Sequence, residues 1–579
     1  MEAHPVIRDA AIRRREVPAD VYAALPGGMR PLLRRVYAAR NVAPREVRMA
    51  MGDLLPVGSL GGATAAAEFL ADAHQRQARV LVVGDFDADG ATASALMVRS
   101  MRAMGLRNVS YLVPNRFEFG YGLSPGVVDL AATRQPDVII TVDNGISSHE
   151  GVNRARALGI EVIVTDHHLP GDDLPGARLI VNPNLPGESF ASKALSGVGV
   201  AFYVMAALAR ELGRRGQSDP DASRRAVSGC LDLVALGTIA DLVRLDWNNR
   251  ILANEGLRRI RARAACPGVM ALLAAAGRDP LSACAADLAF GAAPRLNAAG
   301  RLTDMALGVE CLLAGQEHDA RVLAGRLDEL NRRRRELQER MQAQAHEQLQ
   351  RIVADVTGNH QDGLCLFDDS WHQGIVGLVA SRVKEHTGRP VVAFAPGEEP
   401  GIVKGSARSV DGVHIRDALA AIAARRKVQG MVFGGHAMAA GLRLPRSQLE
   451  VFREEFSAEV ARQCALADTA RVVLTDGPLE AGELQPAVAE ELYFAGPWGQ
   501  GFPEPLFDNE FAIVEQRVLR DAHLRLVLRH PDGGEPLDAI AFRQTRALPA
   551  RARLLYRLGL NFFRGRRQQQ LVVEHIEYE

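Results

Sequence analysis

Three aspartates follow a hydrophobic run and are spaced two residues apart. The run VLVVG at 80–84 leads into Asp85, Asp87 and Asp89. In an extended segment, side chains two apart point the same way, so the three carboxylates would converge on one spot. Like charges that close repel one another unless protons or cations lie between them. The cluster therefore indicates a divalent metal site or, alternatively, an acidic surface turn, because the letters DADG also suit a turn.

Further candidate ligands follow other apolar runs. Asp143 follows IITV, and the triplet Asp166-His167-His168 follows VIVT. Ligands of open α/β sheets bind at the carboxyl ends of the strands, so we expect these segments to meet in one crevice. Asp241 closes the apolar run LVALGTIA, where an unpaired acid beside a core would be costly. Oxygen-rich ligands without thiolate favour Mn²⁺ or Mg²⁺ over Zn²⁺.

The elements that must position these residues alternate between strands and helices from about 79 to 181. Short β-branched runs predict five buried parallel strands, and the stretches between them predict helices. The strand segments are RVLVVGD, NVSYLVP, DVIITVD, IEVIVTD and ARLIVNP. This alternation indicates a doubly wound parallel sheet, which mainly helical sequence follows to about residue 263.

The pattern changes three times in the rest of the chain. A polar stretch at 317–355 predicts one long helix, and we interpret its four arginines at 332–335 as a solvated face. A second α/β unit follows from 363 to about 464. From 470 onward, six strand-like runs around the turn PDGGE predict a small OB-type barrel, a fold that often binds single-stranded nucleic acid. We therefore expect a multidomain α/β protein.

Composition narrows the class of protein. A chain of 579 residues needs several domains, since a single core stops growing at about 250–300 residues. The formal net charge is zero, so nucleic-acid contacts must come from local patches. The six cysteines form no CxxC pair, which argues against zinc and disulfides. Without a secretory signal or a membrane-spanning apolar stretch, we expect a cytoplasmic bacterial protein.

Several motifs together resemble those of the DHH phosphoesterases. The first set, in this order and spacing, is GDFDADG, TVDNG, TDHH and LGTIADLV. KGSARSVDGVHIRDAL and FGGHAMAAGL are similar to the glycine-rich, phosphate-gripping domain that accompanies DHH domains. The resemblance narrows to the bacterial single-strand-specific DNA exonucleases of this family through VPNRFEFGYGLS, GAAPRLNAAGR, WHQGIVGLVASR and GPWGQGFPEPLF. It covers the chain from about residue 50 to the end.

The resemblance implies a domain order and an activity. The expected parts are an N-terminal segment at 1–48, a DHH catalytic domain at 49–315, a connecting helix at 316–361, a DHH-associated phosphate- and DNA-binding domain at 362–466, and an OB-like DNA-binding domain at 467–579. The implied activity is metal-dependent 5′→3′ degradation of single-stranded DNA to mononucleotides, in DNA repair and recombination. The implied partners are a single-strand-binding protein and a RecQ-like helicase.

The resemblance also implies a site for two Mn²⁺ or Mg²⁺ ions. One ion would be bound by Asp87 and Asp143, and the other by Asp89, Asp143, His167 and Asp241. Asp143 would bridge the ions, Asp85 would be a less direct ligand, and His168 would contact the scissile phosphate. Two neighbouring ions can activate a water and stabilise the leaving oxygen, so no side-chain nucleophile is required. Asp143 and His168 are thus the expected catalytic residues.

The residues expected to hold the DNA come from the same resemblance. A terminal 5′ phosphate would be held by Arg116, Ser406 and Arg408, whose guanidinium and hydroxyl groups are good donors. Contacts to the DNA backbone or to a phosphate are implied for Arg295, Asn297, Arg301 and His436. For Arg295 and Arg301 the alternative is an ordinary surface arginine. Phosphate contacts of this kind carry no sequence information.

Two other classes of function are compatible with part of the motifs. A DHH phosphodiesterase for small nucleotides needs only the first two domains, so the β tail argues against it. A DHH scaffold that binds DNA or replication proteins without cutting would lose the acidic ligands, whereas all of them are present here. Degradation of 5′- and 3′-labelled single strands, with and without divalent metal, distinguishes the three.

Overall fold

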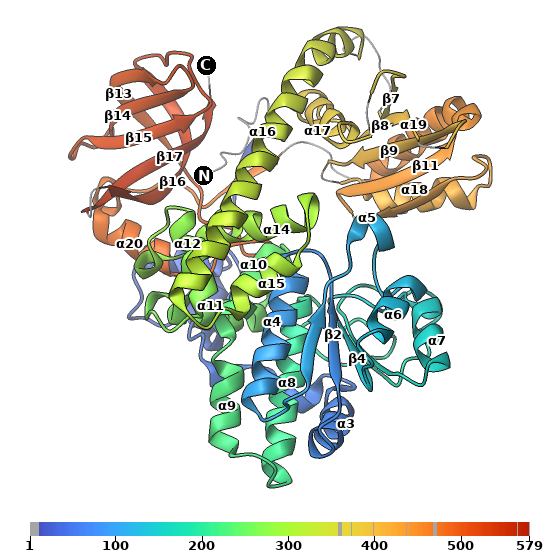
Figure 1. Ribbon diagram of the computed structural model, residues 1–579. Coiled ribbons are helices and arrows are strands. Elements are labelled where there is room, and N and C mark those ends of the chain that lie inside the picture. Colours follow the sequence, from blue (N-terminus) through green and yellow to red (C-terminus); the bar gives the residue numbers. More distant parts are fainter. Residues whose placement is uncertain are drawn as a thin grey trace. The chain divides into compact units, whose positions relative to one another are not determined.

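The chain forms two compact units (Figure 1). The structure is a computed structural model that describes residues 11–356, 362–371, 373–397, 399–410, 412–435, 437–466, 472–563 and 566–577. The first unit contains Arg14–Arg334 and Thr475–Glu579, and the second contains Arg335–Leu474. The C-terminal part of the chain therefore belongs to the same unit as the aspartate-rich region.

A five-stranded parallel sheet with the order β3-β2-β4-β5-β6 forms the centre of the first unit. Its strands are β2 (Val80–Gly84), β3 (Val109–Leu112), β4 (Val138–Val142), β5 (Glu161–Thr165) and β6 (Leu179–Val181). The five predicted strands and the doubly wound sheet are confirmed. Because the winding direction reverses between β2 and β4, the carboxyl ends of these two strands flank a crevice.

Both faces of this sheet are covered by helices, because alternate residues of its strands belong to two different cores. Val80 and Val82 pack into one core, and Leu81 and Val83 into another. The helix α3 (Ala63–Gln75) precedes β2, and the helices between the strands are α4 (Ala88–Ala103), α5 (Arg116–Phe119), α6 (Pro125–Ala132) and α7 (His149–Ala157). Burial on both faces explains why β2 and β4 are apolar throughout.

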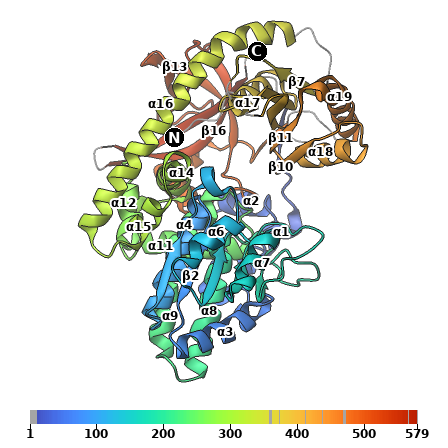
Figure 2. The ribbon, with the colours of Figure 1, turned by 45° about the vertical axis from the view of Figure 1, so that its right-hand side comes forward.

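A helical region follows the sheet, as predicted. Its members are α8 (Gly197–Arg214), α9 (Pro220–Ser228), α10 (Leu231–Ala240), α11 (Trp247–Arg261), α12 (Pro267–Ala275), α13 (Ala285–Asp287), α14 (Ala293–Leu302) and α15 (Ala306–Leu313). The predicted long polar helix is α16 (Glu317–Val356), which Figure 2 shows as one continuous helix. Within the described part of the chain, no single helix is long and apolar enough to cross a membrane.

The second unit is a mixed α/β layer structure. Its sheet has the order β10-β11-β9-β8-β7, in which only β7 and β8 are parallel neighbours. The strands are β7 (Leu364–Phe367), β8 (Val391–Pro396), β9 (Ile402–Arg408), β10 (Val432–Gly435) and β11 (Ala439–Pro445). The helices are α17 (Val376–Thr387), α18 (Ile415–Ala424) and α19 (Leu449–Leu466). One face of β9, β11 and β10 packs on α18 and α19. On the other face, α17 packs on β8 and contacts β9, whereas β11 and β10 are open.

The C-terminal part forms a closed five-stranded barrel with the order β13-β14-β15-β17-β16. The strands are β13 (Phe507–Leu519), β14 (His523–Arg529), β15 (Leu537–Phe542), β16 (Arg551–Phe563) and β17 (Arg566–Glu577). The OB-like barrel is confirmed, but one of the six predicted strands lies outside it. That strand, β12 (Val472–Thr475), pairs with β1 (Ala11–Arg14), a partner too distant in sequence for local patterns to reveal. The helix α20 (Pro486–Phe494) precedes the barrel.

The N-terminal segment, for which the sequence carries no functional signal, completes the core beneath this barrel. Its helices are α1 (Ala19–Ala24) and α2 (Pro31–Ala38). Val36 and Tyr37 of α2 share one apolar core with Phe507 and Phe511 of the barrel. The barrel therefore depends on the N-terminal segment for part of its core.

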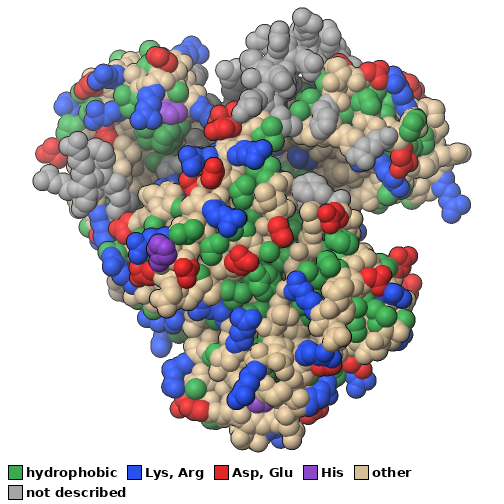
Figure 3. All heavy atoms as spheres, viewed as in Figure 1, with side chains coloured by type: hydrophobic (Ala, Val, Ile, Leu, Met, Phe, Trp, Pro, Cys, Tyr) green, Lys and Arg blue, Asp and Glu red, His purple; other side chains and the backbone are tan. Residues whose placement is uncertain are grey.

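A buried ion pair fixes this arrangement. Arg40 donates to both carboxylate oxygens of Asp476, at 2.7 and 3.0 Å, and the two side chains are 3% and 1% exposed. By contrast, Arg30 and Glu491 form an exposed pair between the same two parts of the chain. On the face seen in Figure 3, acidic and basic side chains are interspersed, and exposed pairs of this kind contribute little.

Arg40→Met tests the buried pair. The substitution should lower the free energy of unfolding of the first unit by about 3 kcal/mol, because it removes the nearest cationic partner of the buried Asp476 carboxylate. Arg30→Met is the matched control and should cost less than about 1 kcal/mol. Urea unfolding followed by tryptophan fluorescence measures both, since Trp498 lies 5.5 Å from the Arg40 guanidinium. Equal losses for the two variants would contradict the assignment.

Candidate metal centre and phosphate site

The three opening aspartates do not lie on one extended segment, which corrects that expectation. β2 ends at Gly84, and α4 begins at Ala88 with Asp87 as its N-cap. One oxygen of Asp87 accepts hydrogen bonds from the backbone N–H groups of Asp89 (2.9 Å) and Gly90 (3.0 Å). Asp85 therefore precedes the helix, Asp87 caps it, and Asp89 lies in its first turn. A strand–turn–helix connection, rather than strand alternation, sets the direction of each carboxylate.

The N-terminus of α8 holds Asp89. Its two carboxylate oxygens accept hydrogen bonds from the backbone N–H groups of Gly197 (2.7 Å) and Val198 (2.9 Å). This side chain is almost completely buried. The positive end of a helix is a favourable place for a carboxylate, so α8 fixes the orientation of Asp89 without a cationic side chain.

Asp143 directly follows β4 in a strained conformation. Its φ is +61°, in the left-handed region that non-glycine residues rarely adopt, and the residue is 2% exposed. The backbone is held by a hydrogen bond from its N–H to the Thr165 carbonyl at 3.0 Å. Gly197 gives the side chain its space, because a Cβ there would lie 2.6 Å from both Cβ and Oδ1 of Asp143. Strain of this kind is typical of functional sites.

Asp166 positions the two histidines that follow it. One of its oxygens accepts hydrogen bonds from the backbone N–H groups of His167 (2.7 Å) and His168 (3.1 Å) and lies 2.7 Å from Nδ1 of His168. The other accepts from the Ile146 N–H at 2.9 Å. Burial alone would raise the pKa of Asp166, but its hydrogen bond with His168 lowers it overall. The carboxylate of Asp166 is thus used inside the loop, and the imidazoles are presented to the crevice.

The predicted ligands come together at the carboxyl ends of the strands. Nε2 of His167 lies 3.1 Å from Oδ1 of Asp143 and 3.5 Å from Oδ2 of Asp241, which caps α10. Three groups of side chains have ligand atoms within 4.8 Å of one another: Asp85, Asp87 and Asp143; Asp89, His167 and Asp241; and Asp143, His167 and His168. Asp143 and His167 each belong to two groups, so the groups form one continuous centre.

The charges of this centre favour a bound cation. Within the described residues, no arginine or lysine pairs with Asp87, Asp89, Asp143 or Asp241. Burial, followed by the charge of Asp87, raises the pKa of Asp89 to about 7. Burial and the charges of Asp89 and Asp87 raise the pKa of Asp241 to about 8 and that of Asp143 well above its ordinary value. Oxygen-rich, electrostatically unbalanced ligands of this type fit Mn²⁺ or Mg²⁺.

Tyr121 lies at the rim of this centre and was not among the predicted residues. Its hydroxyl donates to the Asp143 carbonyl (3.3 Å) and lies 3.3 Å from Nδ1 of His168. Its ring packs edge-on against His168 and Phe86. The motif RFEFGYG contains this tyrosine, but only the spatial proximity to His168 distinguishes it from a neighbouring loop residue.

The residues predicted to follow the DNA backbone have different surroundings. Oδ1 of Asn297 accepts a hydrogen bond from the Ala88 N–H at 2.8 Å, so Asn297 supports the start of α4. Arg295 is 8% exposed, donates to the Gly291 and Ala275 carbonyls, and pairs with Asp328 at 2.7 Å. Arg295 is therefore not an ordinary surface arginine, and its contact to the DNA backbone stays a prediction. Arg301 is exposed at the end of α14.

The second unit carries the predicted phosphate-binding pair. Arg408 is half-buried and donates to Oγ of Ser406 (2.9 Å) and of Ser381 (3.1 Å). No described carboxylate forms an ion pair with this guanidinium. Burial lowers the pKa of Arg408. An anion bound beside the guanidinium would raise this pKa again. The side chain of Arg116 and the whole of His436 lie outside the described residues.

Three parts of the chain match known domain families. The DHH family, N-terminal domain, matches residues 79–238, the DHHA1 domain matches 352–462, and the RecJ OB domain matches 475–575. The single-stranded-DNA-specific exonuclease RecJ of Salmonella typhimurium is 50% identical over 575 residues, which cover 98% of each chain.

Solved structures give the same relationship. RecJ of Thermus thermophilus in complex with Mn²⁺ matches with a TM-score of 0.78 at 31% identity, over 99% of this chain and 80% of that one. Its complex with Mg²⁺ matches with a TM-score of 0.71 at 29% identity, over 99% and 79%. The three domain matches and the full-length similarity agree. The chain therefore belongs to the RecJ family of single-stranded-DNA-specific exonucleases.

Proposed function

We propose that this protein is a metal-dependent exonuclease that degrades single-stranded DNA from its 5′ end to mononucleotides. The observation that carries the proposal is the continuous centre of three ligand groups, which Asp143 and His167 link. Two divalent ions bound there supply an activated water and stabilise the leaving oxygen of a phosphodiester. The activity for which the RecJ relatives are named and the metals in their solved structures support the same chemistry.

We assign the ligands as the family pattern implies. Asp87 and Asp143 hold one ion, and Asp89, Asp143, His167 and Asp241 hold the other. The geometry supports a closer role for Asp85 than expected, because it shares a group with Asp87 and Asp143. No side-chain nucleophile is needed, so the carboxylates act by placing the ions.

His168 is assigned to the scissile phosphate. Its Nδ1 faces Asp166, so the ring is held in one orientation. Burial alone would lower the pKa of His168, but this hydrogen bond raises it to about 9. A cationic imidazole stabilises the negative charge that develops on the phosphate.

A second proposal concerns the 5′ end of the strand. Ser406 and Arg408 hold the terminal phosphate, together with Arg116. Gly377, the second residue of α17, supports this position, since a Cβ there would lie 3.1 Å from Arg408 Nη2 and 3.2 Å from Ser406 Oγ. A helix N-terminus, a hydroxyl and a half-buried guanidinium together form a favourable phosphate site.

We extend the proposal to the domains, partners and location. Catalysis is assigned to 49–315, strand binding to 362–466 and 467–579, and the connection to 316–361. Contacts to the DNA backbone or to a phosphate are assigned to Arg295, Asn297, Arg301 and His436, and Asn297 also supports the start of α4. A single-strand-binding protein, a RecQ-like helicase and a cytoplasmic location follow from the family resemblance, and the six free cysteines are compatible with that compartment.

The direction of degradation is the first test. With 5′-labelled single-stranded DNA and Mn²⁺, the first labelled product should be a mononucleotide. EDTA should abolish its release, and Asp143→Ala should lower the rate on the order of 10³-fold, because both ions lose a ligand. Release of the label from the 3′ end first, or cutting in EDTA, would refute the proposal.

The pH dependence of stability is the second test. Asp89 and Asp241 have raised pKa values of about 7 and about 8 in the fold, against an ordinary value of 3.8. A carboxyl raised in this way destabilises the fold as the pH rises from its unfolded to its folded pKa. In EDTA the melting temperature of the wild type should therefore fall between about pH 4 and pH 8, relative to that of Asp143→Ala. At pH 8, Mn²⁺ should restore the melting temperature of the wild type but not that of Asp143→Ala. An equal rise in both proteins would contradict the assignment of the metal site.

Gly197→Ala tests the positioning of Asp143 without removing a ligand. The added methyl group should displace the Asp143 carboxylate and raise the Mn²⁺ concentration needed for half-maximal activity about tenfold or more. Gly199→Ala, two residues further along α8, is the matched control, because its Cβ would meet the side chains of Leu195 (2.6 Å) and Ser196 (3.4 Å) but no predicted metal ligand. The same Mn²⁺ requirement in both variants would show that the close approach of Gly197 does not matter.

A further inference from the structure

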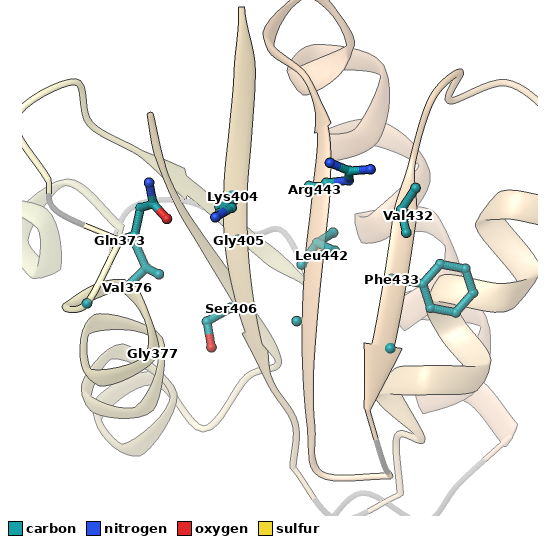
Figure 4. A pocket seen from close by; sticks show the side chains of 13 residues that line it. Gln373, Val376, Gly377, Lys404, Gly405, Ser406, Val432, Phe433, Leu442 and Arg443 are labelled. Atoms are coloured by element: carbon teal, nitrogen blue, oxygen red, sulfur yellow. The ribbon is translucent and has the colours of Figure 1, made fainter. Parts of the chain in front are cut away.

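A cavity of about 540 Å³ lies on the open face of the second unit's sheet (Figure 4). It is bordered by the segment that leads into α17 and by the strands β9, β11 and β10. Lys404, Ser406 and Arg443 are its polar side chains on these strands. Its volume lies within the range of about 300–1,000 Å³ that small-ligand sites occupy. Of its lining residues, Ser406 and Gly377 are the ones used by the function proposed above.

The floor of this cavity is flat. In the strand register, Ser406 pairs with Gly441, and Gly441 pairs with Gly434, so the three residues form one row across β9, β11 and β10. Strands lie about 4.8 Å apart, and the row is therefore roughly 10 Å long. A Cβ on Gly441 or Gly434 would meet no atom within 4 Å. The space above the two glycines is open.

The backbone conformation does not account for these glycines. Neither Gly434 nor Gly441 has a positive φ, so any residue could adopt their conformation. Glycine weakens a strand interior, and in that position it often marks the close approach of a ligand to the backbone. The absence of side chains here keeps the floor flat, next to the predicted phosphate-binding Ser406.

A cationic row borders the floor on one side. Lys404 pairs with Arg443, and Arg443 pairs with Val432, two residues along the same strands and thus about 7 Å from the glycine row. Arg443 has a single weak ion pair, with Glu399 at 3.5 Å, and both side chains are more than half exposed. Val432, on the edge strand, is an exposed apolar side chain. The cavity thus combines donors along one edge with a flat backbone surface.

We propose that this cavity binds the 5′-terminal nucleoside of the DNA strand, with the base lying flat over Gly441 and Gly434. The inference rests on the proposed function, because Ser406 and Arg408 anchor the terminal phosphate at the start of the row. Arg443 and Lys404 face the acceptor atoms on the edge of the base. Since every base has a flat face and acceptors on its edge, the site accepts all four. The second unit therefore recognises a 5′-nucleoside monophosphate without any metal ion.

Calorimetric titration of the full-length protein in EDTA tests the inference. The two probes are 2′-deoxyadenosine 5′-monophosphate and 2-deoxyribose 5-phosphate, which differ only by the base. The wild type should bind the nucleotide about tenfold or more tightly than the sugar phosphate. In Gly441→Val this ratio should fall to about one, while the affinity for the sugar phosphate stays the same. Valine favours strands, so the melting temperature of the variant should not fall.

A second variant keeps the test independent of Gly441. Arg443→Gln should also lower the affinity for the nucleotide and leave that for the sugar phosphate unchanged. A wild-type ratio near one, or an unchanged ratio in Gly441→Val, overturns the base-binding site. If Arg408 does not bind the terminal phosphate, a different result is expected, because Arg408→Gln would then lower the affinity for neither probe. The exonuclease proposal is judged separately, by release of the 5′ label in Mn²⁺.

Discussion

Mutual repulsion among buried carboxylates is the constraint around which the first unit is built. Asp89 and Asp143 are almost completely buried, and within the described residues neither has an arginine or lysine partner. Their positions depend on backbone groups instead, namely the N-terminus of α8 and the left-handed conformation after β4. A nearby cationic side chain would stabilise the metal-free fold but would also compete with the metal. The site therefore gives up stability to keep its charge available, as functional sites often do.

Close packing around the ligands enforces the same arrangement. Gly197 and Gly237 bring α8 and α10 against the carboxylates, since a Cβ on Gly237 would lie 2.7 Å from Oδ1 of Asp89. Helix and ligand thus approach at backbone distance, and neither can move without the other. This rigidity supports preorganisation, in which the ligands are in place before an ion binds.

The sequence predicts the sheet and the composition of the site because both depend on local rules. Apolar β-branched runs identify β2 and β4, and parallel strands bring their carboxyl ends together. The details that it misses depend on distant partners. DADG suits a strand end, a turn or a helix cap equally well, and only the packing of α8 selects the cap. Arg295 is buried because Asp328, on another helix, pairs with it, and no local pattern contains that information.

The chemistry of cutting and that of end recognition require opposite charges, and the two sites that we propose for them lie in different units. A terminal phosphate needs cations, for which we propose Arg408, whereas the metal centre needs carboxylates without cationic neighbours. Placed on one sheet edge, the two sets would neutralise each other and bind neither metal nor phosphate. Their separation lets the half-buried Arg408 keep its charge for an anionic ligand. An enzyme that must locate a strand end before hydrolysis can therefore evolve each task without weakening the other.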